Sequence, residues 1–471
     1  MTTTDPRLAP DTPRDVLIAD HARLREAADA GALAGLDERR RVLVSMRDML
    51  VTGTADAEAA LAEDLRRSAT EAWMTEVGFT IGQIDHALDH LEHWARPRRV
   101  RLGLTLRPGR ARVVPTPRGL VGIIAPWNYP LQLTLAPLVA AIAAGNTAVV
   151  KPSELAPATS ALLSRWIPDY LGEHVAVVTG GAEPTATMLE QRFDHLFYTG
   201  GSRVARIVAA AAARDLTPTT LELGGKSPAI ITRSADLRIA ARRIAWGRFV
   251  NAGQTCVAPD HVFVPREQRD ELVDHLRTAI TDMYGTDPSA SPDYGRIISG
   301  HHLARLSGYL AEPDAGTVVV GGTTEPSSRY MAPTIVIDPN PNSSLMTEEI
   351  FGPILPVVAY DHLDDAITSI RSRPHPLALY LFSTSDDDIE HVTARTTSGG
   401  MLVNHTLLHL AAEDLPFGGV GESGMGAYHG QWGFDAFSHL RAVMYRPMRP
   451  DPSVMYPPYG TLTARLLRRL F

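Results

Sequence analysis

The sequence is poor in cysteine: its 471 residues include a single one, Cys256. An internal disulfide is therefore excluded, which is in keeping with a reducing compartment. Aromatic residues make up only 6% of the chain, whereas hydrophobic residues reach 44% and charged residues 21%, a composition typical of globular proteins. A chain of this length exceeds one ordinary hydrophobic core, so we expect two or three packed lobes.

The sequence also lacks an excess of positive charge and any long apolar stretch. Its formal net charge is −8, so we expect no general attraction for nucleic acid, whose binding proteins usually carry a basic domain or stripe. The longest uncharged apolar run, 135–144, contains Pro137 and is too short to cross a bilayer. The first residues show neither the basic nor the apolar region of a secretory signal. We therefore expect a cytoplasmic protein without an integral membrane segment.

The pattern of apolar residues, and with it the predicted secondary structure, changes along the chain. Residues up to Arg96 place apolar side chains at helical spacing, and the segment 97–118, rich in Arg, Pro and Gly, predicts exposed strands or a linker. From Leu120 onward, short β-rich runs alternate with helical stretches; the runs are 120–125, 148–150, 175–178 and 195–198, and the helices 133–144 and 158–167. This alternation predicts a parallel, doubly wound α/β sheet. A second α/β stretch follows at 227–417.

The only cysteine ends the motif Asn251-Ala252-Gly253-Gln254-Thr255-Cys256, between a predicted helix at 238–250 and a predicted strand at 261–264. A glycine-containing loop at a helix end exposes backbone N–H groups that favour a thiolate and an adjacent oxyanion. The local sequence is equally compatible with an inert thiol, because free cysteine is among the most buried residue types.

Two further motifs place polar side chains in apolar surroundings. In Leu221-Glu222-Leu223-Gly224-Gly225-Lys226, burial would raise the pKa of the carboxylate towards neutrality and make it a usable general base. The alternative is a carboxylate that caps a turn. In Pro126-Trp127-Asn128-Tyr129-Pro130, an amide follows a predicted strand, where α/β sheets bind ligands. Asn128 would there stabilise an oxyanion, or serve only as a turn residue between prolines.

Taken with four more motifs, these sequences resemble the aldehyde dehydrogenase superfamily in order and spacing, over about residues 40–445. The four are Lys151-Pro152-Ser153-Glu154, Tyr198-Thr199-Gly200, Glu349-Ile350-Phe351-Gly352-Pro353 and Pro416-Phe417-Gly418-Gly419-Val420. The stretches 256–260 and 423–430 are similar to the class 3 branch. Tyr456-Pro457-Pro458-Tyr459-Gly460 is similar to bacterial coniferyl-aldehyde dehydrogenases.

The resemblance implies NAD(P)-dependent oxidation of an aldehyde to a carboxylic acid. Cys256 would form a thioester, Asn128 would help to hold the oxyanion, and Glu222 would activate water for hydrolysis. It also implies substrate contacts from Tyr129 and Thr255, no metal, and cofactor contacts from Trp127, Lys151, Glu154, Thr199, Gly200, Gly201, Ser202, Leu223, Glu349 and Phe351. A carboxylate at position 154 would repel a 2′-phosphate, so we expect NAD, with NADP possible.

The implied architecture has three parts and is α/β in class. A Rossmann-like parallel-sheet domain that binds NAD(P) would comprise residues 1–96 and 119–222, and an α/β catalytic domain residues 223–425. A bridging or oligomerisation element would comprise 97–118 and 426–471, and the class 3 resemblance implies a homodimer. The pyrophosphate turn departs from the family pattern, because Gly201 stands where Ser or Asn is usual and Ala205 where Gly is usual. Cofactor affinity is the property that this departure puts in question.

The substrate and the reaction type leave alternatives open. Trp127, Tyr129 and apolar residues near 405–410 indicate a hydrophobic entrance, hence an aromatic or medium- to long-chain aliphatic aldehyde, unless these residues pack in the core. A CoA-acylating dehydrogenase is the first alternative, and the presence of Glu222 argues against it. A cofactor-independent cysteine hydrolase is the second, although no motif histidine accompanies Cys256. The third is a non-enzymatic derivative of the fold that has lost its cofactor site.

Overall fold

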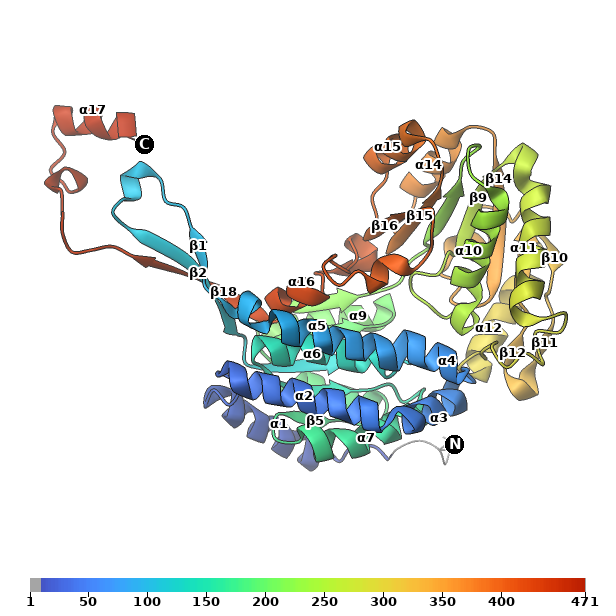
Figure 1. The fold of residues 1–471 in the computed structure, drawn as a ribbon, viewed down its shortest axis with the longest axis horizontal. Coiled ribbons are helices and arrows are strands. Elements are labelled where there is room, and N and C mark those ends of the chain that lie inside the picture. The colour runs from blue at the N-terminus through green and yellow to red at the C-terminus, as the bar shows by residue number, and fades with distance from the viewer. Residues whose placement is uncertain (1–9, 471) are drawn as a thin grey trace.

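The computed structural model describes residues 10–470 as two α/β lobes and a projecting arm (Figure 1). The first lobe contains a six-stranded sheet of order β17-β7-β6-β3-β4-β5, parallel except for the β17–β7 pair. Its strands are β3 (Leu120–Ile124), β4 (Thr147–Lys151), β5 (Val175–Val177), β6 (His195–Thr199), β7 (Thr219–Glu222) and β17 (Gly424–Met425). The four strands predicted between 120 and 198 are confirmed as β3 to β6, each end shifted by at most one residue.

Both faces of this sheet are covered by helices, because successive side chains of each strand point to opposite faces. Val121 and Ile123 of β3 join the larger core, whereas Leu120 and Ile124 join a second core on the other face. The larger core is covered by α2 (Leu36–Thr52), α3 (Thr54–Leu65), α5 (Gly78–Ala95), α6 (Gln132–Ala144), α7 (Pro157–Leu171) and α16 (Gly430–Ala436). The second lies under α1 (Arg14–Asp29), α8 (Ala182–Glu190) and α9 (Ser202–Arg214). The helices predicted at 133–144 and 158–167 are confirmed as α6 and α7.

The order of the strands reverses at β3. From β3 the chain moves outward through β4 and β5, then returns to the other side of β3 to form β6 and β7. In open α/β sheets, ligands bind in the crevice outside the carboxyl ends of the strands at such a switch point. The segments that follow β3 and β6, and Glu222 at the end of β7, all lie at this edge.

The second lobe contains a seven-stranded sheet of order β10-β13-β14-β9-β8-β15-β16, in which only β10 pairs antiparallel. The strands are β8 (Pro228–Ile231), β9 (His261–Pro265), β10 (Thr317–Val320), β13 (Thr334–Ile337), β14 (Ile354–Tyr360), β15 (Ala378–Phe382) and β16 (Gly400–Val403). The helices are α10 (Leu237–Phe249), α11 (Arg269–Tyr284), α12 (Gly300–Ala311), α13 (Ser344–Thr347), α14 (Leu363–Arg371) and α15 (Asp386–Arg395). A short hairpin of β11 (Thr324–Glu325) and β12 (Tyr330–Met331) lies outside the sheet. The sequence-predicted helix and strand that flank Cys256 are confirmed as α10 and β9.

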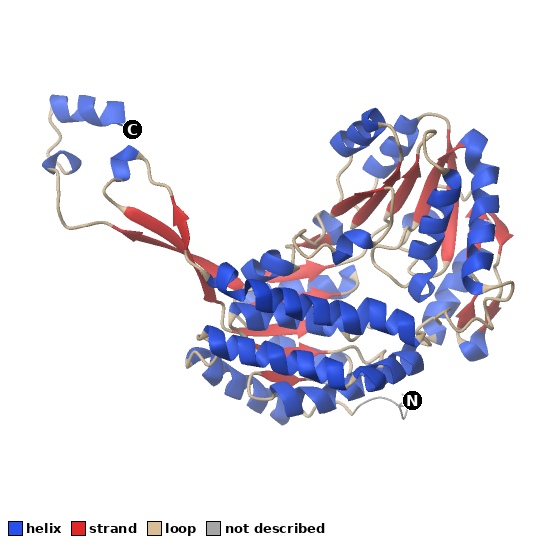
Figure 2. Cartoon of the chain, viewed as in Figure 1, coloured by secondary structure: helices blue, strands red, loops and turns tan. Residues whose placement is uncertain are grey.

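The arm is an antiparallel sheet of β1 (Arg98–Val100), β2 (Arg110–Pro117) and β18 (Ser438–Tyr445), which joins segments from the two ends of the chain. It extends away from both lobes, and α17 (Thr461–Leu470) lies beyond it (Figure 2). The strands expected within 97–118 are therefore present. Within residues 10–470, no helix combines the length and the apolar character needed to cross a membrane.

Candidate active site

Cys256 lies where two cavities meet. One cavity, of about 250 Å³, is lined by Cys256 with Pro126, Trp127, Asn128, Leu133, Thr199, Gly200, Gly201, Glu222, Leu223, Gly224, His302, Arg305, Glu349 and Phe351. The other, of about 210 Å³, is lined by Cys256 with Met74, Thr75, Phe79, Tyr129, Gln132, Leu133, Trp246, Val250, Thr255, Val257, Leu407, Leu408, Leu410, Ala411, Phe417, Tyr428 and His429. We call the first the switch-point cavity, because it opens at the carboxyl ends of β3 and β6, and the second the apolar cavity.

The structure brings together most of the residues that the sequence singled out. All three predicted catalytic residues line the switch-point cavity, as do seven of the ten predicted cofactor residues. Tyr129 and Thr255, predicted to contact the substrate, line the apolar cavity, where their hydroxyl oxygens lie 2.6 Å apart. Lys151, Glu154 and Ser202 line neither cavity.

The loop that carries Cys256 has an unusual backbone. Asn251 and Ala252 adopt φ of 52° and 50° in succession, a left-handed conformation that is strained for residues other than glycine. At Gly253, which has φ of 75°, a Cβ atom would lie 2.3 Å from the Gly352 carbonyl oxygen, so only glycine fits there. The loop thus turns sharply out of α10 and places Cys256 at the junction of the cavities.

The Asn128 side chain is fixed in orientation. Its Nδ2 atom donates to the Gln254 carbonyl oxygen at 3.0 Å, and Asn128 is 3% exposed. An amide nitrogen has two hydrogens, so one N–H is engaged by the cysteine loop and the second is left for another acceptor. Together with the backbone N–H of Cys256, this second N–H can form a two-donor site for a developing oxyanion.

Glu222 is a buried carboxyl group without a partner among the described residues. It is 2% exposed, and neither side-chain oxygen forms a hydrogen bond within residues 10–470. Burial raises the pKa of Glu222 well above its usual value, because desolvation disfavours the charged form. A carboxyl group with a raised pKa beside a nucleophile can exchange a proton with water near neutral pH, as a general base requires.

The Cys256 thiol is held in its neutral form. Burial raises its pKa to about 12, with further contributions from the Glu349 and Glu222 carboxylates. Backbone N–H groups of the loop lower the pKa, as the sequence predicted, but burial outweighs them. The predicted effect of the loop is therefore present, and a base or a positive charge beside the sulfur would add to it in forming the thiolate.

Glu349 lies against the backbone of the Glu222 motif. A Cβ atom at Gly224 would come within 2.2 Å of the Glu349 Oε1 atom, so glycine at 224 admits the carboxylate. Burial, followed by the charge of Asp260, raises the pKa of Glu349 to about 8. Phe351 packs edge-on against Trp127 with ring centroids 5.2 Å apart. These contacts place an acid and two aromatic rings on the wall of the switch-point cavity.

The turn between β6 and α9 is the segment predicted to bind the pyrophosphate of a dinucleotide. Gly201 is the N-cap of α9, and a Cβ atom there would have no neighbour within 4 Å, so the helix N-terminus is open for an anionic group. Ala205 is 2% exposed and packs into the second core, where its methyl group is accommodated. Lys151, at the end of β4, pairs with Glu154 at 3.0 Å. The open N-terminus of α9 and the residues that line the switch-point cavity therefore fit NAD(P), and they would hold it when it is bound.

Sequence reasoning missed several residues of the site. His302 and Arg305 of α12 line the switch-point cavity, and the His302 ring lies 5.0 Å from that of Trp127. Arg67 and Glu76 form a buried ion pair whose neighbours include the Asn128 loop. All four lie outside the motifs, in charged or polar helical stretches that look like solvated surface, so no local signal marks them.

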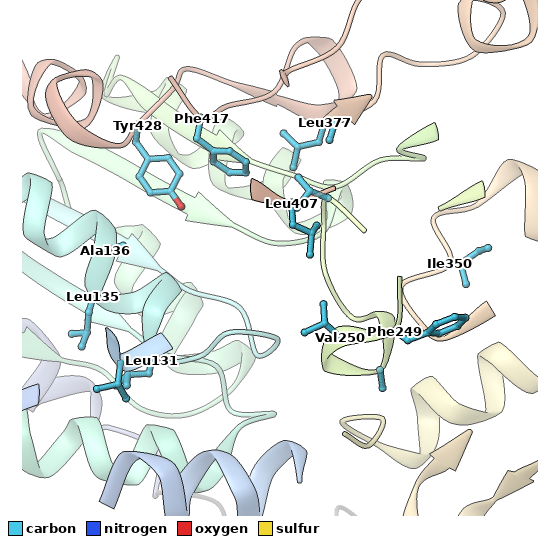
Figure 3. Close-up of a cluster of buried hydrophobic side chains, with 14 of the residues drawn as sticks. Leu131, Leu135, Ala136, Phe249, Val250, Ile350, Leu377, Leu407, Phe417 and Tyr428 are labelled. Carbon is cyan, nitrogen blue, oxygen red and sulfur yellow. The ribbon is translucent and has the colours of Figure 1, made fainter. Parts of the chain in front are cut away.

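The apolar cavity is built from segments far apart in the sequence. Val250 follows α10, Leu407 follows β16, and Phe417 and Tyr428 come from the segment before α16 (Figure 3). Trp246, Met74 and Phe79 complete an aliphatic and aromatic wall. The hydrophobic character expected near 405–410 is confirmed, since Leu407, Leu408 and Leu410 line this cavity rather than pack only in the core.

A cluster with metal-type ligands lies outside both cavities. Atoms of Glu38, Glu173 and His174 come within 4.8 Å of one another. Glu38 is already engaged, because Arg41 donates to it at 2.5 Å and His174 lies 3.0 Å away. The cluster is thus a network of ion pairs among surface helices and carries no argument for a metal.

Comparison with known proteins agrees with this geometry. The family model described as "Aldehyde dehydrogenase family" matches residues 15–443. Aldehyde dehydrogenase family 3 member B1 of Rattus norvegicus is 45% identical over 448 residues, which cover 94% of this chain and 95% of the relative. The dimeric NADP-preferring aldehyde dehydrogenase of Mus musculus is 42% identical, covering 93% of this chain and 96% of the relative.

A solved structure gives the same result. The substrate-bound state of Staphylococcus aureus AldH superposes with a TM-score of 0.94 at 38% identity, covering 97% of this chain and 99% of that one. A family model that spans most of the chain, relatives above 40% identity and two α/β lobes with a partly buried cysteine where their cavities meet all point the same way. This chain belongs to the aldehyde dehydrogenase family.

Proposed function

We propose that this NAD(P)-dependent aldehyde dehydrogenase oxidises hydrophobic aldehydes, aromatic or medium- to long-chain aliphatic, with Cys256 as nucleophile. The observation that carries the proposal is the position of Cys256 between the switch-point cavity, which is lined by seven of the ten predicted cofactor residues, and the apolar cavity. The apolar cavity measures about 210 Å³, and an apolar cavity of about 150 Å³ accommodates a benzene ring. One aromatic ring or a folded alkyl chain therefore fits against Cys256.

The first half of the reaction forms a thioester. The Cys256 sulfur attacks the aldehyde carbon after its proton passes to a base, for which Glu222 is the buried carboxyl group on the same cavity. The carbonyl oxygen becomes an oxyanion held by the free Asn128 N–H and the Cys256 backbone N–H. NAD(P), when bound, would supply the acceptor for the hydride that leaves the substrate carbon. The carbonyl then re-forms as a thioester on Cys256.

The second half hydrolyses the thioester. Once the proton taken from Cys256 has passed from Glu222 to solvent, the Glu222 carboxylate accepts a proton from water, the resulting hydroxide adds to the thioester carbon, and the carbon–sulfur bond breaks to give the acid and the Cys256 thiolate. Because Glu222 has no hydrogen-bond partner among the described residues, its carboxylate is free to orient a water molecule. The proposed cofactor ligands are Lys151, Glu154, Thr199, Gly200, Gly201, Ser202, Leu223, Glu349, Phe351 and Trp127, with Tyr129 and Thr255 against the substrate.

We also propose which part of the chain binds the cofactor, which carries the catalytic residues and which forms the oligomer. Residues 1–96 and 119–222 would bind NAD(P), 223–425 would carry the catalytic lobe, and 97–118 with 426–471 would form the oligomerisation arm, except that β17 (Gly424–Met425) and α16 (Gly430–Ala436) pack on the first lobe. The arm exposes apolar side chains, with Leu104 79%, Tyr445 64% and Met448 91% exposed, which supports burial against a second copy. The mouse relative is named as dimeric, so we propose a homodimer in the cytoplasm. Light scattering after gel filtration tests this, and a monomer would contradict it.

The function is tested by NADH absorbance with a panel of aromatic and aliphatic aldehydes. NAD and NADP are run in parallel, with and without CoA, and the product is identified. We expect CoA-independent turnover to the acid, with higher kcat/KM for hydrophobic aldehydes than for acetaldehyde. Turnover that requires CoA would instead show an acylating enzyme. Absence of turnover together with absence of NAD(P) binding would overturn the redox function.

A further inference from the structure

A buried ion cluster from the N-terminal part of the chain lies behind the proposed active site. It comprises Arg67, Glu71 and Glu76, which come from the short segment between α3 and α5. The side chains of Arg67 and Glu76 are 0% exposed and that of Glu71 is 10% exposed. Removing charges from water is costly, and hydrophobic residues of similar volume often replace a buried ion pair without loss of stability. The cluster therefore calls for an explanation other than stability.

Arg67 joins the two loops that carry the proposed catalytic groups. Its Nη2 atom donates to the Asn128 carbonyl oxygen, and its Nε atom donates to Asn251 Oδ1 at 3.1 Å. Its Nη1 atom pairs with Glu76. A guanidinium group directs its N–H donors in a fixed plane, so these three bonds define the relative position of the two loops.

Side-chain amides complete the connection between the loops. Asn251 Nδ2 donates to the Asn128 carbonyl oxygen at 2.9 Å and to the Gln254 carbonyl oxygen at 3.0 Å. Asn128 Nδ2 donates to that same Gln254 oxygen at 3.0 Å. The direction of the Asn128 amide therefore depends on where Gln254 lies, and Gln254 is held by a side chain that Arg67 binds.

The two glutamates bind backbone N–H groups of the two loops that Arg67 connects. Glu71 accepts the backbone N–H of Asn251 at 3.0 Å, at the residue where the loop enters its left-handed conformation. Glu76 accepts the backbone N–H groups of Leu131 and Gln132 at 2.8 and 2.9 Å, at the start of α6. The cluster thus stabilises a strained loop on one side and anchors the Asn128 segment on the other.

We propose that Arg67 is a positioning residue for thioester formation, which sets the Asn128 amide against Cys256 by binding both loops. Arg67 lines neither cavity, so it acts through Asn128 and not on the substrate. The proposal rests on the roles proposed above for Asn128 and Cys256. A displacement of about 1 Å between catalytic groups lowers rates by about 100-fold, so the loss of this connection has a measurable cost.

The test is a double-mutant cycle with Arg67→Lys and Asn128→Ala, followed as single-turnover formation of NADH. Lysine keeps the charge opposite Glu76 but lacks the planar fork. We expect Arg67→Lys to slow NADH formation about 10- to 100-fold in the native background and only about twofold in the Asn128→Ala background. A merely structural role would give equal losses in both backgrounds, and that result would overturn the proposal.

Two further variants keep the test decisive. Arg39→Lys is the matched control, because Arg39 is also a buried arginine, donating to the carbonyls of Leu33 and Ala143 away from both cavities; we expect its single-turnover rate to stay within about twofold. If Arg67→Lys does not fold, Asn251→Gly takes its place, since glycine suits the positive φ and removes the three hydrogen bonds of the Asn251 side chain. NADH formation by the wild type and by Arg39→Lys establishes the proposed function separately, so additivity in the cycle would refute the role of Arg67 alone.

Discussion

The two cavities that meet at Cys256 differ in chemistry. The switch-point cavity carries Glu222 and Glu349, two acids whose pKa values burial raises, and a helix N-terminus open to an anion. The apolar cavity is lined mainly by aliphatic and aromatic side chains. The proposal thus assigns proton transfer and cofactor binding to one side of the sulfur and substrate recognition to the other. We therefore expect substitutions in the switch-point cavity to change the rate and substitutions in the apolar cavity to change the substrate preference.

Replacing Cys256, which lines both cavities, should have the largest effect. Cys256→Ala removes the proposed nucleophile, and we expect aldehyde turnover to fall at least about 10⁴-fold, because a covalent route has no substitute in the site. Binding of NAD(P)H, followed by fluorescence, should stay unchanged within about twofold. NADH production retained by the variant would contradict the assignment of the nucleophile.

On the switch-point side, Glu222→Gln should slow hydrolysis of the thioester more than its formation. Rapid mixing should show a burst of NADH close to one per active site, followed by a steady rate about 10²- to 10³-fold lower, the usual contribution of a general base. Glu390→Gln, which changes an exposed acid, is the control and should keep the native rate. A slow burst with an unchanged steady rate would instead place Glu222 in acylation.

The same substitution should stabilise the protein at alkaline pH. The pKa of Glu222 is raised on folding, so the stability that this group contributes is complete below its unfolded pKa and is lost as the pH rises through the folded pKa. Glutamine does not titrate. The gain in Tm of Glu222→Gln, measured by scanning fluorimetry, should therefore be larger at pH 8 than at pH 4, and an equal gain at both would contradict a buried carboxyl group with a raised pKa.

These effects also show what the sequence could predict. Cys256, Glu222 and Asn128 were identified because each lies in a short motif that resembles the aldehyde dehydrogenase family, whereas each motif alone left a structural alternative open. Arg67 and Glu76 were not, because charged residues in a helical stretch give no sign of burial. Some of their partners are distant in the sequence: Asn251 lies 184 residues along the chain from Arg67.

The electrostatics of the site show the same limit. The backbone of the loop predicted a lowered pKa for Cys256, and its N–H groups do act in that direction. The opposing burial comes from walls that several segments build together, and Glu349, which adds to the rise, lies in another lobe segment. The local sequence therefore predicted the contribution of the backbone to the pKa of Cys256, whereas the packing of distant segments determined the direction of the overall shift.

On the apolar side, Trp246→Ala should change preference more than chemistry. Trp246 lines the cavity and packs edge-on against His405 at 5.8 Å. We expect kcat/KM for a bulky aromatic aldehyde to fall about tenfold or more, because hydrophobic contacts with the substrate are lost, while that for acetaldehyde changes little. Trp432→Ala, at a half-exposed tryptophan outside both cavities, should leave the ratio unchanged. Equal losses for both aldehydes would show that Trp246 supports the fold and not recognition.

The smallest expected effect concerns the turn at which α9 begins. Gly201 has φ of −79° and ψ of 149°, and a Cβ atom there meets no neighbour within 4 Å, so serine fits without strain. Its hydroxyl would add a hydrogen bond to the helix N-terminus or to a bound phosphate, which should lower the Kd for NAD about two- to fivefold in a calorimetric titration. Gly181→Ser is the matched control, since Gly181 is likewise an open N-cap, of α8, remote from both cavities. A lower Kd in both variants would point to general stabilisation of the lobe. A lower Kd in Gly201→Ser alone would show that the glycine at the N-cap of α9 weakens cofactor binding.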